Sequence, residues 1–238
     1  MLLNKTNLET ELILERKKFN VENDILNDVR LILSENQNRR DAISKELSAK
    51  SSTNENKFDF DLLETDKIFH LEQIKKVSID YRLRFLDSHL FKNEIPEEAI
   101  SKINLLEKNH DTTLEGFKIM APSKTFQLMS YDDPLLFAPI GNNYYYLIHK
   151  WGNDLSATRK LKVLPFKSLF HFLFMTLLLS VLITLLIPVN NLSRSIPLAG
   201  FIEFLFVWKG VIAVGLYGFF MAGKNFNTRI WNRKYFNN

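Results

Sequence analysis

The sequence contains no cysteine and no short motif that indicates a known catalytic chemistry. Without thiols, the chain has no disulfides, zinc–thiolate sites or cysteine nucleophiles. A Walker A loop, a GxGxxG turn, a GxSxG elbow and an HExxH pair are also absent. The histidines stand singly, at His70, His89, His110, His149 and His171. We therefore predict no catalytic residue, no metal site and no cofactor.

The charge is modest and unevenly placed. The 238 residues carry a formal net charge of +4, and the basic residues of the last third gather at the ends of two apolar runs. That arrangement is typical of membrane topology signals, so we do not expect a nucleic-acid partner. The first residues are too charged for a signal peptide, which needs an apolar stretch of about 7–15 residues.

Two long apolar segments follow one another near the C-terminus. Residues 168–187 contain no formal charge, and residues 197–222 contain only Glu203 and Lys209. A helix of about 20 apolar residues crosses a hydrocarbon core of about 30 Å. Because only residues 188–196 separate the two segments, we predict two transmembrane helices that form an antiparallel hairpin in contact with membrane lipid.

The outer ends of this hairpin are basic. Basic residues before the first segment and after the second are Arg159, Lys160, Lys162, Lys167, Lys224, Arg229, Arg233 and Lys234, whereas the connection holds only Arg194. The positive-inside rule places such flanks in the cytoplasm. We therefore predict a multi-pass protein of the cytoplasmic (inner) membrane, with both termini cytoplasmic and residues 223–238 forming a basic tail.

Lys209 is the most unusual residue of the second segment, because a charge deep in a bilayer costs from a few to more than about ten kcal/mol. We expect protein rather than lipid to cover it. Three hydroxyls recur every four residues in the first segment, at Thr176, Ser180 and Thr184. They lie near the depths of Lys209 and Glu203. They can bond across the hairpin or to their own helix backbone, and the sequence leaves both roles open.

A stripe of small residues lies nearly opposite Lys209 on the second segment. It contains Gly215, Gly218 and Ala222, which allow two backbones to approach closely. If one face of the helix closes the hairpin, the other face requires a different neighbour. We therefore assign membrane interaction to the lysine, to Glu203, to the three hydroxyls and to this stripe, and we expect a homo-oligomer or another integral membrane protein as partner.

The N-terminal part predicts a helical arm over residues 1–47, with helix over 8–47. Its apolar residues follow a broken three-four spacing at Leu12, Phe19, Leu26, Val29, Leu33, Ile43 and Leu47. Asn36 and Arg40 interrupt this seam, so packing on a partner helix and dimerisation both remain open. Residues 48–57 are polar without periodicity, and they predict a linker.

Residues 58–155 predict a compact cytoplasmic α+β domain. Within it we predict helices over 66–76 and 96–108, strands over 77–85, 116–121 and 124–129, and a hairpin of strands 134–140 and 144–151. The strict alternation over 77–85 is the strongest strand signal in the chain. The predicted fold class is thus an α+β domain with an N-terminal helical arm and an α-helical two-pass transmembrane hairpin.

The aromatic stretch over 144–151 is a second candidate site. Alternation predicts two rows on opposite faces of the strand: Tyr144, Tyr146 and Ile148, and then Tyr145, Leu147, His149 and Trp151. In one interpretation, one row fills the core and the other packs on a helix or the membrane. In the alternative, a ligand or partner is recognised by Tyr144, Tyr145, Tyr146, His149, Trp151 and Asp154.

Three functions are compatible with these features. The hypothesis that we favour is a membrane-anchored interaction or scaffold subunit that presents its cytoplasmic domain to a partner. The second is a ligand-sensing membrane effector whose hairpins oligomerise into a pore. The third is a membrane-tethered enzyme, since catalytic groups can lie far apart in a sequence.

Overall fold

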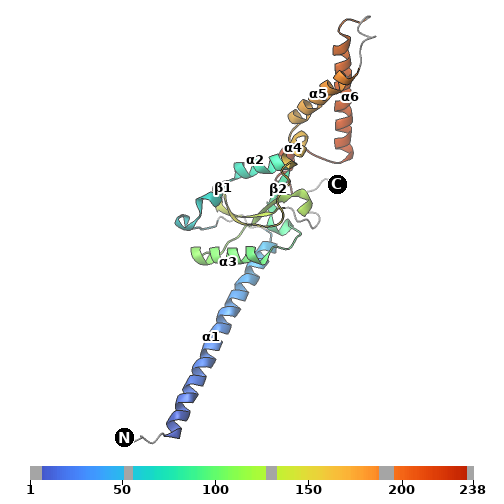
Figure 1. The fold of residues 1–238 in the computed structure, drawn as a ribbon. Coiled ribbons are helices and arrows are strands. Elements are labelled where there is room, and N and C mark those ends of the chain that lie inside the picture. The colour runs from blue at the N-terminus through green and yellow to red at the C-terminus, as the bar shows by residue number, and fades with distance from the viewer. Residues whose placement is uncertain (1–6, 51–55, 127–132, 188–195, 235–238) are drawn as a thin grey trace, which may run out of the picture.

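The computed structural model describes residues 7–50, 56–126, 133–187 and 196–234. Figure 1 shows three parts in a row: the long helix α1 (Leu8–Ser48), a domain built round a five-stranded sheet, and two apolar helices, α5 (Leu169–Leu186) and α6 (Ala199–Met221). The free end of α1 and the apolar pair point away from the domain in opposite directions.

Helix α1 has 41 residues and is about 60 Å long. It begins after Asn7, whose Oδ1 accepts a hydrogen bond from the Glu9 N–H at 3.0 Å. Only its C-terminal turns are buried in the domain, where Ile43 and Leu47 are both 3% exposed. The helix predicted over 8–47 is confirmed, and its end contributes to the domain core.

The sheet is antiparallel and has the strand order β1-β5-β4-β3-β2. The strands are β1 (Ile68–His70), β2 (Leu83–Asp87), β3 (Lys118–Pro122), β4 (Leu135–Gly141) and β5 (Tyr144–Lys150). β4 and β5 form the predicted hairpin, and its turn holds Asn142 and Asn143 at φ values of 49° and 64°. Positive φ at both central residues matches the twist of a two-residue hairpin. The strand predicted over 116–121 is confirmed as β3.

Helices cover both faces of the sheet (Figure 1). α3 (Glu97–His110) lies with the end of α1 on one face, and α2 (Leu71–Tyr81) lies on the other. The first core contains Ile103 of α3 and Ile119 of β3, and the second contains Ile74 of α2 and Phe85 of β2. The helix predicted over 96–108 is confirmed as α3.

Short elements connect these layers: η1 (Phe60–Leu62), η2 (Thr65–Lys67), η3 (Ser88–Leu90), η4 (Ser123–Phe126), α4 (Arg159–Val163), η5 (Leu164–Phe166) and α7 (Asn227–Ile230). Of the predicted linker, residues 51–55 lie outside the described residues. Asn56 is 7% exposed, and its Nδ2 donates to the carbonyls of Glu115 and Pro139 at 2.9 and 2.8 Å. This end of the linker therefore belongs to the folded domain.

The prediction of a strand over 77–85 is wrong for its first half. Helix α2 continues to Tyr81, Arg82 takes a left-handed conformation with φ of 54°, and β2 begins only at Leu83. Leu71, Ile74, Ser78 and Tyr81 pack toward the second core at helical spacing. Burial of this helical face overrides the alternation. The helix predicted from Asp66 likewise begins later, after the capping residue His70.

The strand predicted over 124–129 is also corrected. Ser123–Phe126 form the 3₁₀ turn η4, and residues 127–129 lie outside the described residues. Phe126 is 3% exposed, and its ring lies 5.8 Å from that of Phe91 in the first core. Within the described part of this segment, the apolar signal comes from this one buried aromatic on a turn.

A β-bulge changes which way the end of β5 faces. Leu136 pairs with His149, and Phe137 pairs with Leu147, so Ile148 has no partner on β4. The extra residue shifts the alternation by one position. Consequently His149 lies against α3 and Trp151 packs on the first core, not on the face of Tyr145 and Leu147 as predicted.

Helices α5 and α6 are long and apolar enough to cross a membrane, with 18 and 23 residues and mean hydropathies of 2.4 and 1.8. They pack against each other. Only 17% and 6% of their apolar stretches are buried within the chain, unlike the core helix of a soluble domain. Burying these surfaces requires an apolar environment outside the described residues of this chain.

Truncation of the first core should destabilise the domain. Ile103 is fully buried on α3, whereas Leu105 on the same helix is 58% exposed. We expect I103A to lower the free energy of unfolding by about 2–5 kcal/mol and L105A to change it by less than about 0.5 kcal/mol. Denaturant unfolding of the detergent-solubilised chain measures both, and equal effects would contradict this core assignment.

Candidate functional site

The two ends of the α5–α6 hairpin meet the domain at residues 79–87, which we call the hub. The hub comprises the end of α2, the left-handed Arg82 and strand β2. Residues 159–167 lead into α5, residues 225–234 follow α6, and both segments bond to the hub. Since these segments lie far apart in the sequence, only the fold brings them together.

The segment that leads into α5 is held by ionic contacts. The Lys167 ammonium lies 2.6 Å from Asp80 Oδ1, and the Asp80 side chain is 11% exposed. Arg159 Nε donates to the carbonyl of Tyr81 at 2.9 Å. This carbonyl belongs to the last residue of α2, where a cation also complements the helix dipole. The Arg159 guanidinium thus provides a hydrogen bond for the last carbonyl of α2, next to the segment that leads into the hairpin.

Asn227 is the central residue on the side that follows α6. It is 1% exposed. Its Nδ2 donates to the Ile79 carbonyl at 2.9 Å, and its Oδ1 accepts from Arg82 Nη1 at 2.6 Å. Burial and the charge of Arg159 lower the pKa of Arg82. The amide therefore satisfies a carbonyl at the end of α2 and a half-buried guanidinium at once.

The chain after α6 also covers the open edge of β2. The Phe85 N–H donates to the Trp231 carbonyl at 2.7 Å, and Arg84 Nη1 donates to the Arg233 carbonyl at 2.9 Å. Burial, with the charges of Arg82 and Arg233, lowers the pKa of Arg84 to about 10. Covering the edge in this way hinders β2 from pairing with a foreign strand.

Asp87 joins the same segment to the end of β2. Its side chain is 4% exposed, with Lys118 at 2.7 Å and Lys234 at 2.6 Å from its two oxygens. Burial opposes ionisation, but the hydrogen bonds from the two lysines outweigh it and lower the pKa of Asp87. The next residue, Ser88, donates from Oγ to the Leu47 carbonyl of α1 at 2.7 Å. Adjacent residues thus hold the arm and the chain after α6.

Aromatic rings pack where α5 begins and α6 ends. The ring of Phe219 lies 5.1 Å from Phe166, 5.5 Å from Phe172 and 5.1 Å from Phe226. The Arg82 guanidinium lies 5.6 Å over the Phe166 ring, within the range of a cation–π contact. Arg82 therefore contacts both the segment before α5 and the segment after α6.

The predicted hydroxyl stripe faces α6 but bonds to its own helix. Thr176 and Ser180 are 7% and 0% exposed. The hydroxyls of Thr176, Ser180 and Thr184 each donate to a backbone carbonyl about one turn earlier, at 2.8 Å. Trp208 Nε1 donates across the hairpin to Thr176 Oγ1 at 3.4 Å. All three hydroxyls thus donate to the backbone of their own helix. The donor that reaches Thr176 across the hairpin is Trp208, not Lys209.

Of the small stripe, Gly215 makes the close helix contact. A Cβ at Gly215 would lie 2.7 Å from Phe172 Cζ, whereas no atom of the described residues lies within 4 Å of a Cβ at Gly218. Ala222 is exposed. Gly215 therefore sets the distance between α5 and α6, and the other two residues lie outside their contact.

Lys209 is exposed on the surface of the hairpin, at the middle of α6. Glu203 is half-buried, and its Oε2 is buried without a hydrogen-bond partner in the described part of the chain. An apolar groove of about 700 Å³ also opens between α5 and α6, lined by residues that include Met175 and Gly210. The hairpin alone therefore covers neither its lysine nor this groove.

The residues of the predicted recognition surface lie on both faces of the sheet. Tyr146, His149 and Trp151 lie on the side of the first core, Tyr145 packs on the second, and Tyr144 and Asp154 are exposed. The Lys102 Nζ lies 2.9 Å from His149 Nδ1. Burial and the Lys102 charge lower the pKa of His149. The residues of the predicted recognition surface are thus divided between the first core, the second core and the exposed surface.

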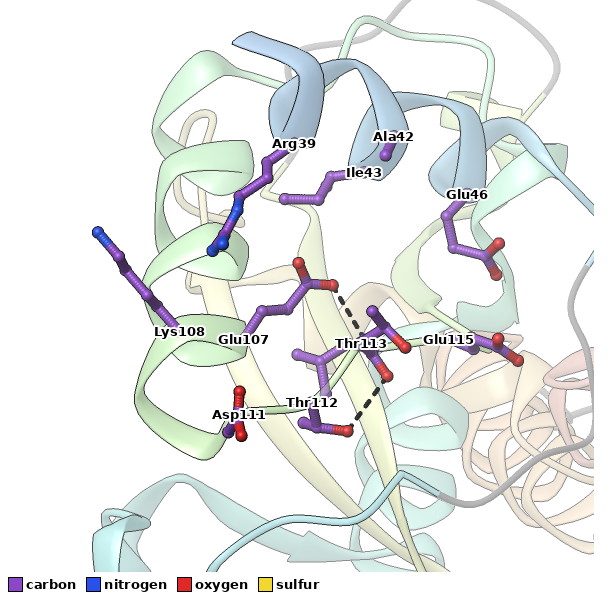
Figure 2. A pocket seen from close by; sticks show the side chains of 11 residues that line it. Arg39, Ala42, Ile43, Glu46, Glu107, Lys108, Asp111, Thr112, Thr113 and Glu115 are labelled. Atoms are coloured by element: carbon purple, nitrogen blue, oxygen red, sulfur yellow. Dashed lines mark hydrogen bonds between the residues drawn. The ribbon is translucent and has the colours of Figure 1, made fainter. Parts of the chain in front are cut away.

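A polar groove of about 870 Å³ lies between the end of α1, the end of α3 and residues 111–115. Figure 2 shows Arg39 and Glu46 extending from α1 into this groove, Arg39 on the side of α3 and Glu46 on the side of Glu115. Glu107 Oε1 accepts from the Leu114 N–H at 2.9 Å. Burial raises the pKa of Glu107. This carboxyl braces the loop after α3, and among the described residues no group of three or more His, Asp or Glu could hold a metal ion.

In a comparison with known proteins, no family model, no curated protein and no solved structure matches the chain.

Sequence reasoning missed the hub as a site. Residues 223–238 were predicted to be a basic tail, yet Asn227 and Ile230 are buried at 1% and 6% exposure. The available signal was the presence of apolar residues within this basic segment, among them Phe226, Ile230 and Trp231. A lone asparagine carries no periodicity, so nothing in the sequence pointed to Asn227.

Removing the Asn227 amide should free the segment that follows α6. We expect N227A to lose two buried hydrogen bonds, each worth about 0.5–3 kcal/mol, and amide exchange over residues 226–231 to accelerate at least about tenfold. T228A changes the exposed neighbour and is the control. Hydrogen-exchange mass spectrometry measures both, and unchanged exchange in N227A would show that Asn227 does not hold this segment.

The contribution of Asp87 should depend on pH. Its folded pKa lies below the ordinary value of 3.8, so its stabilising effect is complete above that value and is lost as pH falls through the folded pKa. We expect D87N to be less stable than the wild type near neutrality and the difference to narrow below pH 3.8. Denaturant unfolding across pH measures this, with the exposed Asp61→Asn as control. A difference that does not change with pH would contradict the assignment.

Proposed function

We propose that this protein is an integral membrane scaffold subunit. In this proposal α5 and α6 anchor the chain in the cytoplasmic membrane, the hub holds the α+β domain against the anchor, and α1 presents an apolar face to a helix of a partner protein. The single observation that carries the proposal is the exposed apolar row on α1, at the end of the molecule opposite the two apolar helices.

The row on α1 has the spacing of a helix-pairing surface. Leu12, Phe19, Leu26 and Leu33 recur every seven residues and are 71%, 65%, 53% and 62% exposed. A heptad row of this kind packs into the holes of a facing helix. The row precedes the part of α1 that α3 covers, where Asn104 Nδ2 donates to Asn36 Oδ1 at 2.8 Å. About three heptads therefore extend from the domain without a partner in the described residues.

The anchor follows from length, composition and exposure. Both helices are long and apolar enough to span, and both are mostly exposed. The clustering of basic residues at 159–167 and 224–234 supports a cytoplasmic domain and cytoplasmic termini by the positive-inside rule. Because the hub binds both of these flanks, the domain lies next to the membrane surface and the arm extends away from it.

Lys209 supports assembly within the membrane as well. It is exposed at the middle of an apolar helix, where a lipid environment would be costly. A second copy of the chain or another integral membrane protein that covers this face would lower the cost. The arm and the lysine thus give the scaffold two separate contact surfaces, one in the cytoplasm and one in the bilayer.

The absence of cysteine permits a direct test of the arm. We would place single cysteines at Leu26, in the heptad row, and at Leu31, outside it; the two side chains are 53% and 57% exposed. Each would carry a thiol-coupled photocrosslinker in the membrane-embedded full chain. We expect a discrete adduct from L26C and little from L31C, because helix pairing buries one face only.

The mass of the adduct identifies the partner, since a self-adduct has twice the 27.9 kDa of the chain. A second substitution, L33S, in the L26C background should reduce the yield by removing one apolar side chain from the row. Equal labelling at both positions, or none at Leu26, would contradict pairing through this face.

A further inference from the structure

Helix α2 lies at the end of the domain from which the hairpin rises (Figure 1). Lys76 is exposed on its outer side, opposite the buried Ile74 and Ser78, and Lys75 and Val77 are exposed on its two flanks. The Lys75 ammonium lies 5.7 Å over the Trp231 ring, beside the chain that follows α6. The lysines of α2 are therefore part of the same surface as the segments that flank the apolar helices.

This surface combines three segments that pack together: α2, α4 and the chain after α6. We call it the basic face, and its exposed cations are Lys75, Lys76, Lys160, Lys162, Lys224 and Arg229. The acidic residues of these segments are Glu72 and Asp80, and Asp80 is already paired with Lys167 at 2.6 Å. The basic face thus carries a clear excess of positive charge.

Membrane topology signals do not account for the whole basic face. The positive-inside rule concerns residues close to the ends of transmembrane segments, which covers the cations of α4 and of the chain after α6. Lys75 and Lys76 lie more than 80 residues before the first apolar helix in the sequence. Only the packing of α2 against α4 and α7 brings them to this surface.

The opposite side of the sheet has a different charge. Helix α3 begins with Glu97 and Glu98 and ends near Glu107 and Asp111, against Lys102 and Lys108. The domain therefore presents positive charge where the apolar helices emerge and carries a slight negative excess on α3. Such a distribution orients a domain on a negatively charged surface.

We propose that the basic face binds phosphate-bearing anionic lipid headgroups of the membrane that α5 and α6 cross. The proposal rests on the proposed function, because it requires the hairpin to be inserted. Its cations contact the headgroups, and Val77 of α2 and Leu161 of α4, 41% and 70% exposed, add an apolar contact from the same two helices. Binding holds α2 flat on the bilayer and leaves α1 extended into the cytoplasm.

The experiment places the full chain in vesicles of phosphatidylcholine alone or with about one third phosphatidylglycerol, which gives the surface a negative potential. A fluorophore on V77C reports contact through quenching by spin-labelled headgroups, and a fluorophore on L105C of α3 is the matched control. We expect stronger quenching at position 77 with anionic lipid. We expect it to reverse as salt rises from about 0.1 M to about 1 M and the Debye length falls from about 10 Å to about 3 Å.

The charge variants are matched pairs of neighbouring lysines. Each lysine near an anionic surface contributes about fivefold to binding, so K75Q/K76Q should lower the ratio of molecules with α2 on the bilayer to molecules tilted away from it by about 25-fold. K17Q/K18Q removes the same charge from the exposed arm and should leave the ratio unchanged. Equal losses in the two variants would point to net charge and would overturn the proposal.

Insertion is checked first in the same samples, by resistance to alkaline carbonate extraction. Extraction of the chain would overturn the proposed anchor and, with it, the basic face. An inserted hairpin with the same quenching at position 77 in neutral and anionic vesicles would overturn the headgroup proposal alone and leave the anchor standing. Anionic-dependent quenching that K75Q/K76Q abolishes supports both.

Discussion

The pairing of partly buried charges at residues 79–87 connects every other part of this structure. Asp80, Arg82, Arg84 and Asp87 place four charges within one turn and one strand, and each contacts a segment that flanks the apolar hairpin. A buried charge that loses its partner is strongly destabilising. The hairpin cannot leave the domain without unpairing these groups, so domain and hairpin are held in one arrangement.

That arrangement connects α1 to the apolar helices through few residues. Asp87 binds Lys234 of the chain after α6, and Ser88 binds the Leu47 carbonyl at the end of α1. Strand β2 is covered by Trp231 along one edge and pairs with β3 along the other. The end of α1 is therefore bonded to the residue that follows β2, and β2 itself is bonded directly to the segment that follows α6.

Particular elements show how far sequence reasoning reached. The β4–β5 hairpin, α3 and the apolar pair were predictable, because each combines a periodicity or a long apolar run with boundary signals, and the long helix was predictable from a three-four spacing that persists although it is broken. The strand over 77–85 failed because the same residues also satisfy a helical face that packs on the sheet. The side of the sheet predicted for His149 and Trp151 was wrong because one unpaired residue, Ile148, reversed the alternation. No local sequence pattern predicts such a bulge.

The sequence by itself determined which segments must be covered by something apolar, because hydropathy and length depend on composition alone. It also determined the basic character of the flanks. Only the tertiary structure decided that Asn227 is buried against the hub, that Gly215 sets the spacing of α5 and α6, and that α2 packs on α4 and α7, which flank the hairpin. Each of these depends on contacts between residues far apart in the chain, and a single side chain carries no record of its distant partner.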